Sequence, residues 1–109
     1  VMDLMAQATD PDLVVAARTG DGDAFGVLFD RWFDRVFDVA VRIVRDREVA
    51  AEVAQDVFLV AWQGLDRLEQ VDSFGGWLLR ISRNRALNRL ARERRSVAMD
   101  DEEATGHMD

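Results

Sequence analysis

The stretch "DAFGVLFDRWFDRVFDVAVRIV", residues 23–44, determines the fold class of this chain. Its apolar residues recur every three or four positions, the spacing that places side chains on one face of an α-helix. These residues are Phe25, Leu28, Phe29, Trp32, Val36, Phe37, Ala40, Ile43 and Val44. The pattern predicts a long amphipathic helix that must bury its apolar side against other elements.

The sequence before and after this stretch predicts two of those elements as helices. Upstream, Asp10 is placed as an N-cap and Pro11 as the first residue of a short helix that ends near Gly20. Downstream, residues 45–48 break the pattern, and a second apolar period covers residues 49–65. A short helix and two long ones therefore succeed one another along the first part of the chain.

A loop and a last helix follow. The residues after Gly64 have mixed polarity and two glycines, which indicate a loop of about ten residues. Asp72 or Ser73 is suited to cap a helix over residues 74–95. The β-branched residues fall at helical positions, so no strand is expected. The fold class is all-α: a compact bundle of about four helices, one short and three long.

The expected organisation is one folded domain with short ends. We expect a flexible N-terminus at residues 1–10, the domain at residues 11–96, and a flexible acidic tail at residues 97–109.

The composition argues against several functional classes. The 109-residue chain has no cysteine, one histidine, His107, in the expected tail, and no glycine-rich phosphate loop. We therefore expect no enzymatic activity, no cofactor and no metal site. No apolar run reaches about 18 residues and the N-terminus lacks a secretory pattern, so we expect a cytoplasmic protein without membrane insertion.

Basic charge is concentrated in the last predicted helix. The net charge of the chain is −7, yet residues 74–95 hold seven of its 14 Lys and Arg residues, all arginine, against one acid, Glu93. Arg85, Arg89 and Arg92 share a stripe that can follow a phosphate backbone. Trp77, Ile81, Asn84 and Asn88 share another face. Such side chains can stack on bases and read their edges, which favours nucleic-acid binding.

A structural interpretation of the same helix stays open at this point. Trp77 and Ile81 are also suited to the core, Asn84 to local hydrogen bonds, and the arginines to solvation of a surface.

The predicted helix over residues 49–65 carries a second distinctive surface. Opposite its apolar stripe lie Glu48, Glu52, Gln55, Asp56 and Gln63. Leu59 is an apolar residue among them, an arrangement typical of a protein-docking patch. Ordinary solvent exposure is the alternative.

Three segments together resemble one known family. They are the step formed by Gly20, Asp21, Ala24 and Phe25, the segment "AEVAQDVFLVAW" at residues 51–62, and "WLLRISRN" at residues 77–84. At these separations the chain resembles, over residues 11–95, the N-terminal domain of extracytoplasmic-function sigma factors, which are bacterial transcription-initiation subunits. The resemblance implies the fold of sigma region 2.

The resemblance also implies two partners. The helix over residues 49–65 would dock on the clamp helices of the largest catalytic subunit of core RNA polymerase. The polar contacts would be Glu52, Gln55 and Asp56, with Phe58, Leu59 and Trp62 nearby. Because family members are commonly held inactive by an anti-sigma factor, such a partner is expected to mask one or both faces.

The second implied partner is promoter DNA, namely the non-template strand of the minus-ten element. Residues 66–76 would form the loop that captures a flipped base, Asn84 would lie beside the bases, and arginines would hold the strand. The full set of expected DNA-binding residues is Arg67, Ser73, Phe74, Trp77, Arg80, Ile81, Arg83, Asn84, Arg85, Asn88, Arg89 and Arg92.

Two departures from the family pattern limit these implications. The loop contains Glu69, Asp72 and the pair Gly75 and Gly76, with only Arg67 basic, so its base preference is not carried over from relatives. Complete members continue into a second, helix-turn-helix domain that nothing after residue 95 can form, so we expect an isolated domain. The alternative functions are a helical protein-interaction module whose basic helix binds an acidic protein, and a binder of duplex DNA.

Overall fold

The computed structural model describes the backbone of residues 2–108 and the side chains of residues 4–98. Within these residues the chain forms five α-helices and two short 3₁₀ helices, and no strand, so the predicted all-α class is confirmed. They are α1 (Met2–Gln7), α2 (Asp10–Arg18), α3 (Gly22–Val44), α4 (Arg47–Gly64), η1 (Leu65–Arg67), η2 (Val71–Ser73) and α5 (Phe74–Met108). None of the helices described combines the length and apolar character that crossing a lipid bilayer requires.

Side-chain N-caps fix the first residues of helices α2, α3 and α4. The Asp21 carboxylate accepts from the Ala24 amide at 3.1 Å at the start of α3, and Asp46 accepts from Glu48 and Val49 at the start of α4. At α2 the cap is Thr9, whose hydroxyl accepts from the Asp12 amide at 3.3 Å. The prediction of Asp10 as the cap was therefore wrong by one residue.

Asp10 has a tertiary role instead of a capping role. Its carboxylate accepts from Trp32 Nε1 at 2.9 Å and forms a salt bridge of 3.0 Å with Arg31. Arg31 also donates to the Ala6 carbonyl oxygen at 2.6 Å. These bonds tie α1 and α2 to α3.

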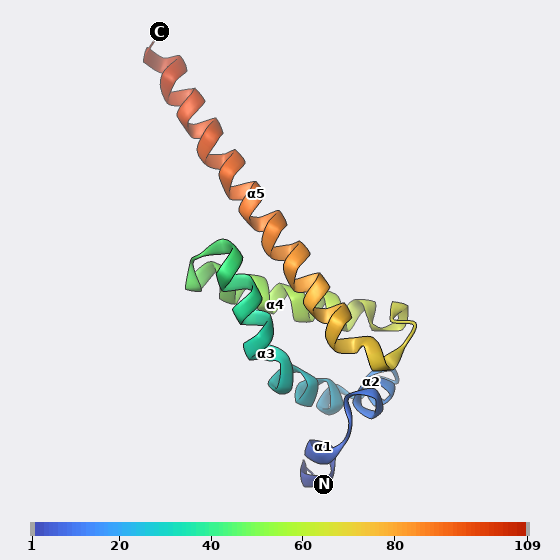
Figure 1. Ribbon diagram of the computed structural model, residues 1–109. Helices are drawn as coiled ribbons and strands as arrows, with labels where there is room; N and C mark the ends of the chain where they lie inside the picture. Colours follow the sequence, from blue (N-terminus) through green and yellow to red (C-terminus); the bar gives the residue numbers. More distant parts are fainter. Residues whose placement is uncertain (1, 109) are drawn as a thin grey trace.

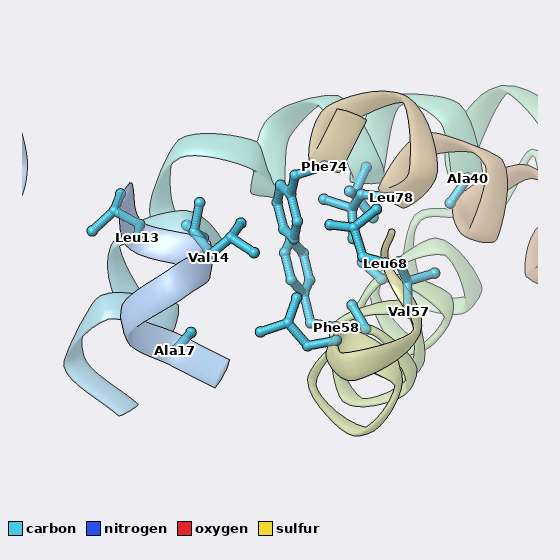
Figure 2. Close-up of a cluster of buried hydrophobic side chains, with 14 of the residues drawn as sticks. Leu13, Val14, Ala17, Ala40, Val57, Phe58, Leu68, Phe74 and Leu78 are labelled. Carbon is cyan, nitrogen blue, oxygen red and sulfur yellow. The ribbon is translucent and has the colours of Figure 1, made fainter. Parts of the chain in front are cut away.

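The core lies between α2, α3, α4 and α5 (Figure 1). Figure 2 shows the rings of Phe58 and Phe74 lying between the α2 side chains Leu13 and Val14 on one side and Leu78 on the other. All five side chains are buried. The helical period read from residues 23–44 is borne out, because Leu28, Val36 and Ala40 of that stretch are buried as well.

The two ends of the chain differ from the sequence-based expectation. Met2–Gln7 forms α1 where a flexible segment is expected, and α5 continues to Met108 instead of ending near Arg95. Good helix formers and the absence of proline or glycine between Trp77 and Thr105 allow this continuation. Figure 1 shows the C-terminal part of α5 extending away from the other helices. The domain limits at residues 11 and 96 remain predictions.

Helix α5 approaches α3 so closely at Gly75 that only glycine fits. A Cβ atom built at position 75 would lie within 2.7 Å of Trp32 Cζ2, inside the van der Waals contact of two carbons. The indole is held in place by its hydrogen bond to Asp10 and by an edge-on contact with Phe74 at 6.3 Å. The ring therefore cannot move aside without breaking these interactions.

Gly75→Ala should lower the free energy of unfolding by about 2 kcal/mol, because overpacking forces the backbone and Trp32 apart. Its neighbour Gly76 is the matched control, since a Cβ there would meet no atom within 4 Å. Gly76→Ala should raise the stability by about 0.5–1 kcal/mol through helix propensity. Thermal unfolding followed by circular dichroism checks both, and equal midpoints would contradict the packing argument.

Candidate functional site

A pocket of about 470 Å³ lies where the two 3₁₀ turns meet the first turns of α5. It is lined by Arg67, Leu68, Glu69, Gln70, Ser73, Gly76, Trp77 and Arg80. Four residues predicted from the sequence to share a site, Arg67, Ser73, Trp77 and Arg80, are thus brought together. We call this the loop pocket.

The loop pocket is built on a buried apolar base. Leu65 and Leu68 are buried, and each 3₁₀ turn contacts α2. The indole of Trp77 is half-buried, with its ring centroid 6.0 Å from that of Phe74. Arg18, the last residue of α2, donates to the main-chain carbonyl oxygens of Leu65 and Leu68. The loop is therefore anchored from below while its polar side chains face solvent.

The donors and acceptors of the loop pocket suit a planar, polar ligand. Trp77 offers an aromatic surface, Arg67 and Arg80 offer guanidinium donors, and Glu69 and Gln70 offer acceptors. Arg67, Ser73 and Arg80 are exposed, so their polar groups are accessible. This combination can stack on a ring and hydrogen-bond its edge.

A second groove, of about 480 Å³, runs between α4 and the middle of α5. We call it the helix groove; it is lined by Glu52, Val53, Asp56, Arg85, Asn88, Arg89, Ala91, Arg92 and Arg95. In this groove the predicted protein-docking residues Glu52 and Asp56 face arginines. These arginines, predicted to bind nucleic acid, are Arg85, Arg89 and Arg92. Arg85 pairs with Asp56 at 3.2 Å, and Arg89 pairs with Glu52 at 2.5 Å.

Arg89 is the most strongly held of these arginines. It bonds Glu52 across the groove and Glu93 one turn on at 3.0 Å, and its side chain is 24% exposed. The hydrogen bond that Arg89 donates to Glu52, and then the one that it donates to Glu93, raise the pKa of Arg89 above its ordinary value. Arg85 and Asp56 are about half exposed, and such surface pairs contribute only about 0–1 kcal/mol each. The Arg85–Asp56 pair can therefore break at little cost, whereas Arg89 is held by two carboxylates.

An apolar patch interrupts the polar surface of α4. Leu59 and Trp62 are exposed and border a shallow hollow with Gly22, Phe25 and Phe58. The rings of Phe25 and Trp62 meet edge to face, with centroids 4.8 Å apart. We call Leu59, Trp62 and the hollow beside them the apolar patch.

Two of the predicted site residues are buried in the core. Phe74 is 1% exposed, and its ring lies among core side chains (Figure 2), so it supports Trp77 from below. Phe58 is 4% exposed and packs on Phe25 and Phe29. Sequence spacing does not separate these rings from surface aromatics, because both kinds of residue lie at helical intervals.

The remaining predicted residues lie on the surface of α4 and α5. Asn88 and Arg92 line the helix groove, Ile81 is half-buried, and Gln55, Arg83 and Asn84 are exposed. Leu68, Glu69, Gln70 and Gly76 also line the loop pocket; they fall within the loop predicted at residues 66–76 but are not among the individually predicted DNA-binding residues. Their place within the predicted loop was the available signal.

Comparison with known proteins identifies similar chains over nearly the whole length. The family model for sigma-70 region 2 matches residues 28–96. The chain is 36% identical over 98 residues to the RNA polymerase sigma-H factor of Pseudomonas aeruginosa, covering 89% of this chain and 51% of that protein. It is 34% identical over 98 residues to the ECF RNA polymerase sigma-E factor of Escherichia coli strain K12, covering 90% and 51%.

A solved structure has the same fold. An engineered region 2 of sigma-E, determined by NMR in complex with GTAAAA, superposes with a TM-score of 0.76 at 33% identity. The match covers 83% of this chain and 94% of that chain. The chain spans about half the length of the curated relatives it matches.

Proposed function

The chain belongs to the extracytoplasmic-function sigma factors of the sigma-70 family, within their region 2, and on this premise we propose that it recognises promoter DNA and binds core RNA polymerase. It acts by binding and catalyses no reaction. In this role it opens the minus-ten element for transcription initiation, and it works in the cytoplasm.

The loop pocket carries the proposal for DNA. It joins an aromatic face to guanidinium, amide and carboxylate groups at the end of a basic helix. Flipping a base out of a duplex costs a few kcal/mol. Stacking of that base on an aromatic side chain stabilises the flipped state by about 1–3 kcal/mol and so offsets this cost. The pocket supports a function in which one base of the non-template strand enters it and stacks near Trp77. The similarity to a region 2 solved with GTAAAA supports the same ligand class.

The proposed path of the strand continues along α5 from the pocket. Arg80, Asn84 and Asn88 follow Trp77 at intervals of three and four residues, so they succeed one another on adjoining turns. Asn84 is exposed and is suited to read base edges, while Arg80 and Arg83 are suited to phosphates. Arg85 and Arg89 contribute less in the free domain, because Asp56, Glu52 and Glu93 already neutralise them.

The proposed polymerase face is the exposed side of α4. Leu59 and Trp62 form an apolar centre there, and polar side chains such as Gln55 lie beside it, as in protein-docking sites. Glu52 and Asp56 add negative charge that favours a basic partner such as the polymerase clamp helices.

An anti-sigma factor that covers one of these faces completes the proposal. The exposed Leu59 and Trp62 side chains support it, because a regulator would bury them in place of polymerase. Pull-downs from stressed and unstressed cells that return polymerase and never a small inhibitory protein would contradict this part.

Asn84→Ala should weaken binding of the preferred single-stranded hexanucleotide about fivefold and leave binding of scrambled sequences unchanged, because it removes a base-reading group without removing charge. The preferred sequence is taken as the tightest binder among GTAAAA and its single-base variants, measured by fluorescence anisotropy.

Arg83→Ala is the matched control on the same turn of α5. It should weaken both kinds of hexanucleotide alike and reduce the salt slope by about 0.7 for one phosphate. Equal effects of the two variants would favour a helix that binds acidic partners through charge. Tighter binding to the duplex than to the single strand would favour an ordinary duplex-binding domain.

A further inference from the structure

Arg18 is the side chain that links α2 to the loop pocket. Its Nε atom donates to the Leu65 carbonyl oxygen at 3.2 Å, and its Nη2 atom donates to the Leu68 carbonyl oxygen. The acceptors lie 47 and 50 residues further along the chain. Among the side-chain hydrogen bonds of residues 4–98, these two are the ones that reach the segment between α4 and α5.

Both acceptors lie where the main chain leaves α4. Leu65 is the C-cap residue of that helix, which ends at Gly64. Carbonyl oxygens at a helix end lack intrahelical partners, and the Leu65 oxygen also accepts from the Leu68 amide at 3.2 Å. A cation at a helix C-terminus is stabilised by these carbonyl groups and by the helix dipole. One planar guanidinium therefore satisfies the helix end and holds the first residue after η1.

The pocket begins at the residues that Arg18 holds. Arg67 and Leu68 are the first residues lining the loop pocket; Glu69 follows at a bend and Gln70 in an extended conformation. The buried Leu65 and Leu68 side chains hold this segment against the core. Apolar contacts are non-directional, however, so they do not fix the orientation of its main chain. Arg18 makes no salt bridge among the described residues, so its fork is not held elsewhere.

We propose that Arg18 is a positioning residue for base selection: it orients the segment 66–70 so that the loop pocket is formed before DNA arrives. Arg18 does not touch DNA itself. The inference rests on the proposed function, and it assigns part of the sequence selectivity of the domain to Arg18 of α2. Ordering the loop in advance lowers the cost of binding a base in it.

The test compares Arg18→Met with Arg18→Lys. Methionine keeps the aliphatic stem and loses both donors, whereas lysine keeps the charge and can reach one carbonyl. Arg18→Met should weaken the preferred hexanucleotide about fivefold more than scrambled sequences, because the pocket must then be ordered on binding. Arg18→Lys should recover part of that selectivity.

Arg31→Met is the matched control, because Arg31 also bridges two elements, through Asp10 and the Ala6 carbonyl, and is distant in sequence from the loop. It removes the same charge and should leave the selectivity ratio unchanged. Hydrogen exchange gives an independent readout: Arg18→Met should speed exchange of amides 66–70 selectively.

Unchanged exchange at residues 66–70, or equal weakening of preferred and scrambled sequences by Arg18→Met, would overturn the positioning role. A wild-type domain that prefers no sequence overturns the proposed function, and with it the role of Arg18 in base selection.

Discussion

Leu59→Asp should reduce the affinity of this domain for core RNA polymerase at least about 30-fold and leave its thermal unfolding midpoint nearly unchanged. Leu59 is 54% exposed on α4, so aspartate there stays hydrated in the free domain and disturbs no core contact. In the proposed complex the same side chain becomes buried at the centre of the docking face. Losing a central apolar contact costs about 2 kcal/mol, which is about 30-fold, and burying an unpaired charge adds to the loss. Binding of labelled domain to purified core polymerase measures the effect.

Val15→Asp is the matched control for this substitution. Val15 is also 54% exposed, lies on α2, and acquires the same charge. It should leave polymerase binding within about twofold of wild type, because surface changes away from an interface contribute little. A comparable loss from both variants would mean that charge or stability, and not the apolar patch, controls binding. No loss from Leu59→Asp would show that α4 docks through another face.

Helices α2, α3 and α4 and the start of α5 could be predicted from the sequence because each has a strong local signal. The apolar period of residues 23–44 corresponds to α3, and the caps at Asp21 and Asp46 are also local features. The first cap was misplaced because Thr9 and Asp10 are both good capping residues, and the choice depends on a tertiary contact. Trp32 lies on α3, yet its indole determines where the Asp10 carboxylate points. Sequence spacing contains no record of such a contact.

Part of the candidate site could also be predicted from local sequence signals. Trp77 and Arg80 lie on one helix and Arg67 and Ser73 in the adjacent loop, so spacing and the family resemblance could group them. The support from Arg18 could not be predicted, because a hydrogen bond to a main-chain carbonyl depends on the fold and not on the acceptor's residue type. Long-range charge pairs present the same difficulty.

The second large predicted effect is on DNA affinity, and it comes from removing the charge pairs of the helix groove. Replacing Glu52 with glutamine and Asp56 with asparagine should strengthen binding of single-stranded DNA by about 5- to 25-fold at 0.1 M salt. Asp56→Asn frees Arg85, and Glu52→Gln leaves Arg89 with Glu93 alone. Each arginine released to a phosphate steepens the salt slope by about 0.7, which at 0.1 M is about fivefold in affinity. Titrations of scrambled and preferred hexanucleotides between low and moderate salt measure affinity and slope together.

The same double substitution should weaken polymerase binding, because it removes two negative charges from the proposed docking face. Asp30→Asn with Asp34→Asn controls for net charge, since both acids are exposed on α3 and form no salt bridge among the described residues. That control should raise DNA affinity only slightly and leave the salt slope unchanged, because screening limits distant charges. If both double variants raised the affinity equally, overall charge would explain the gain. If neither did, Arg85 and Arg89 would serve the packing of α5 on α4, and the basic stripe would not be a DNA-binding surface.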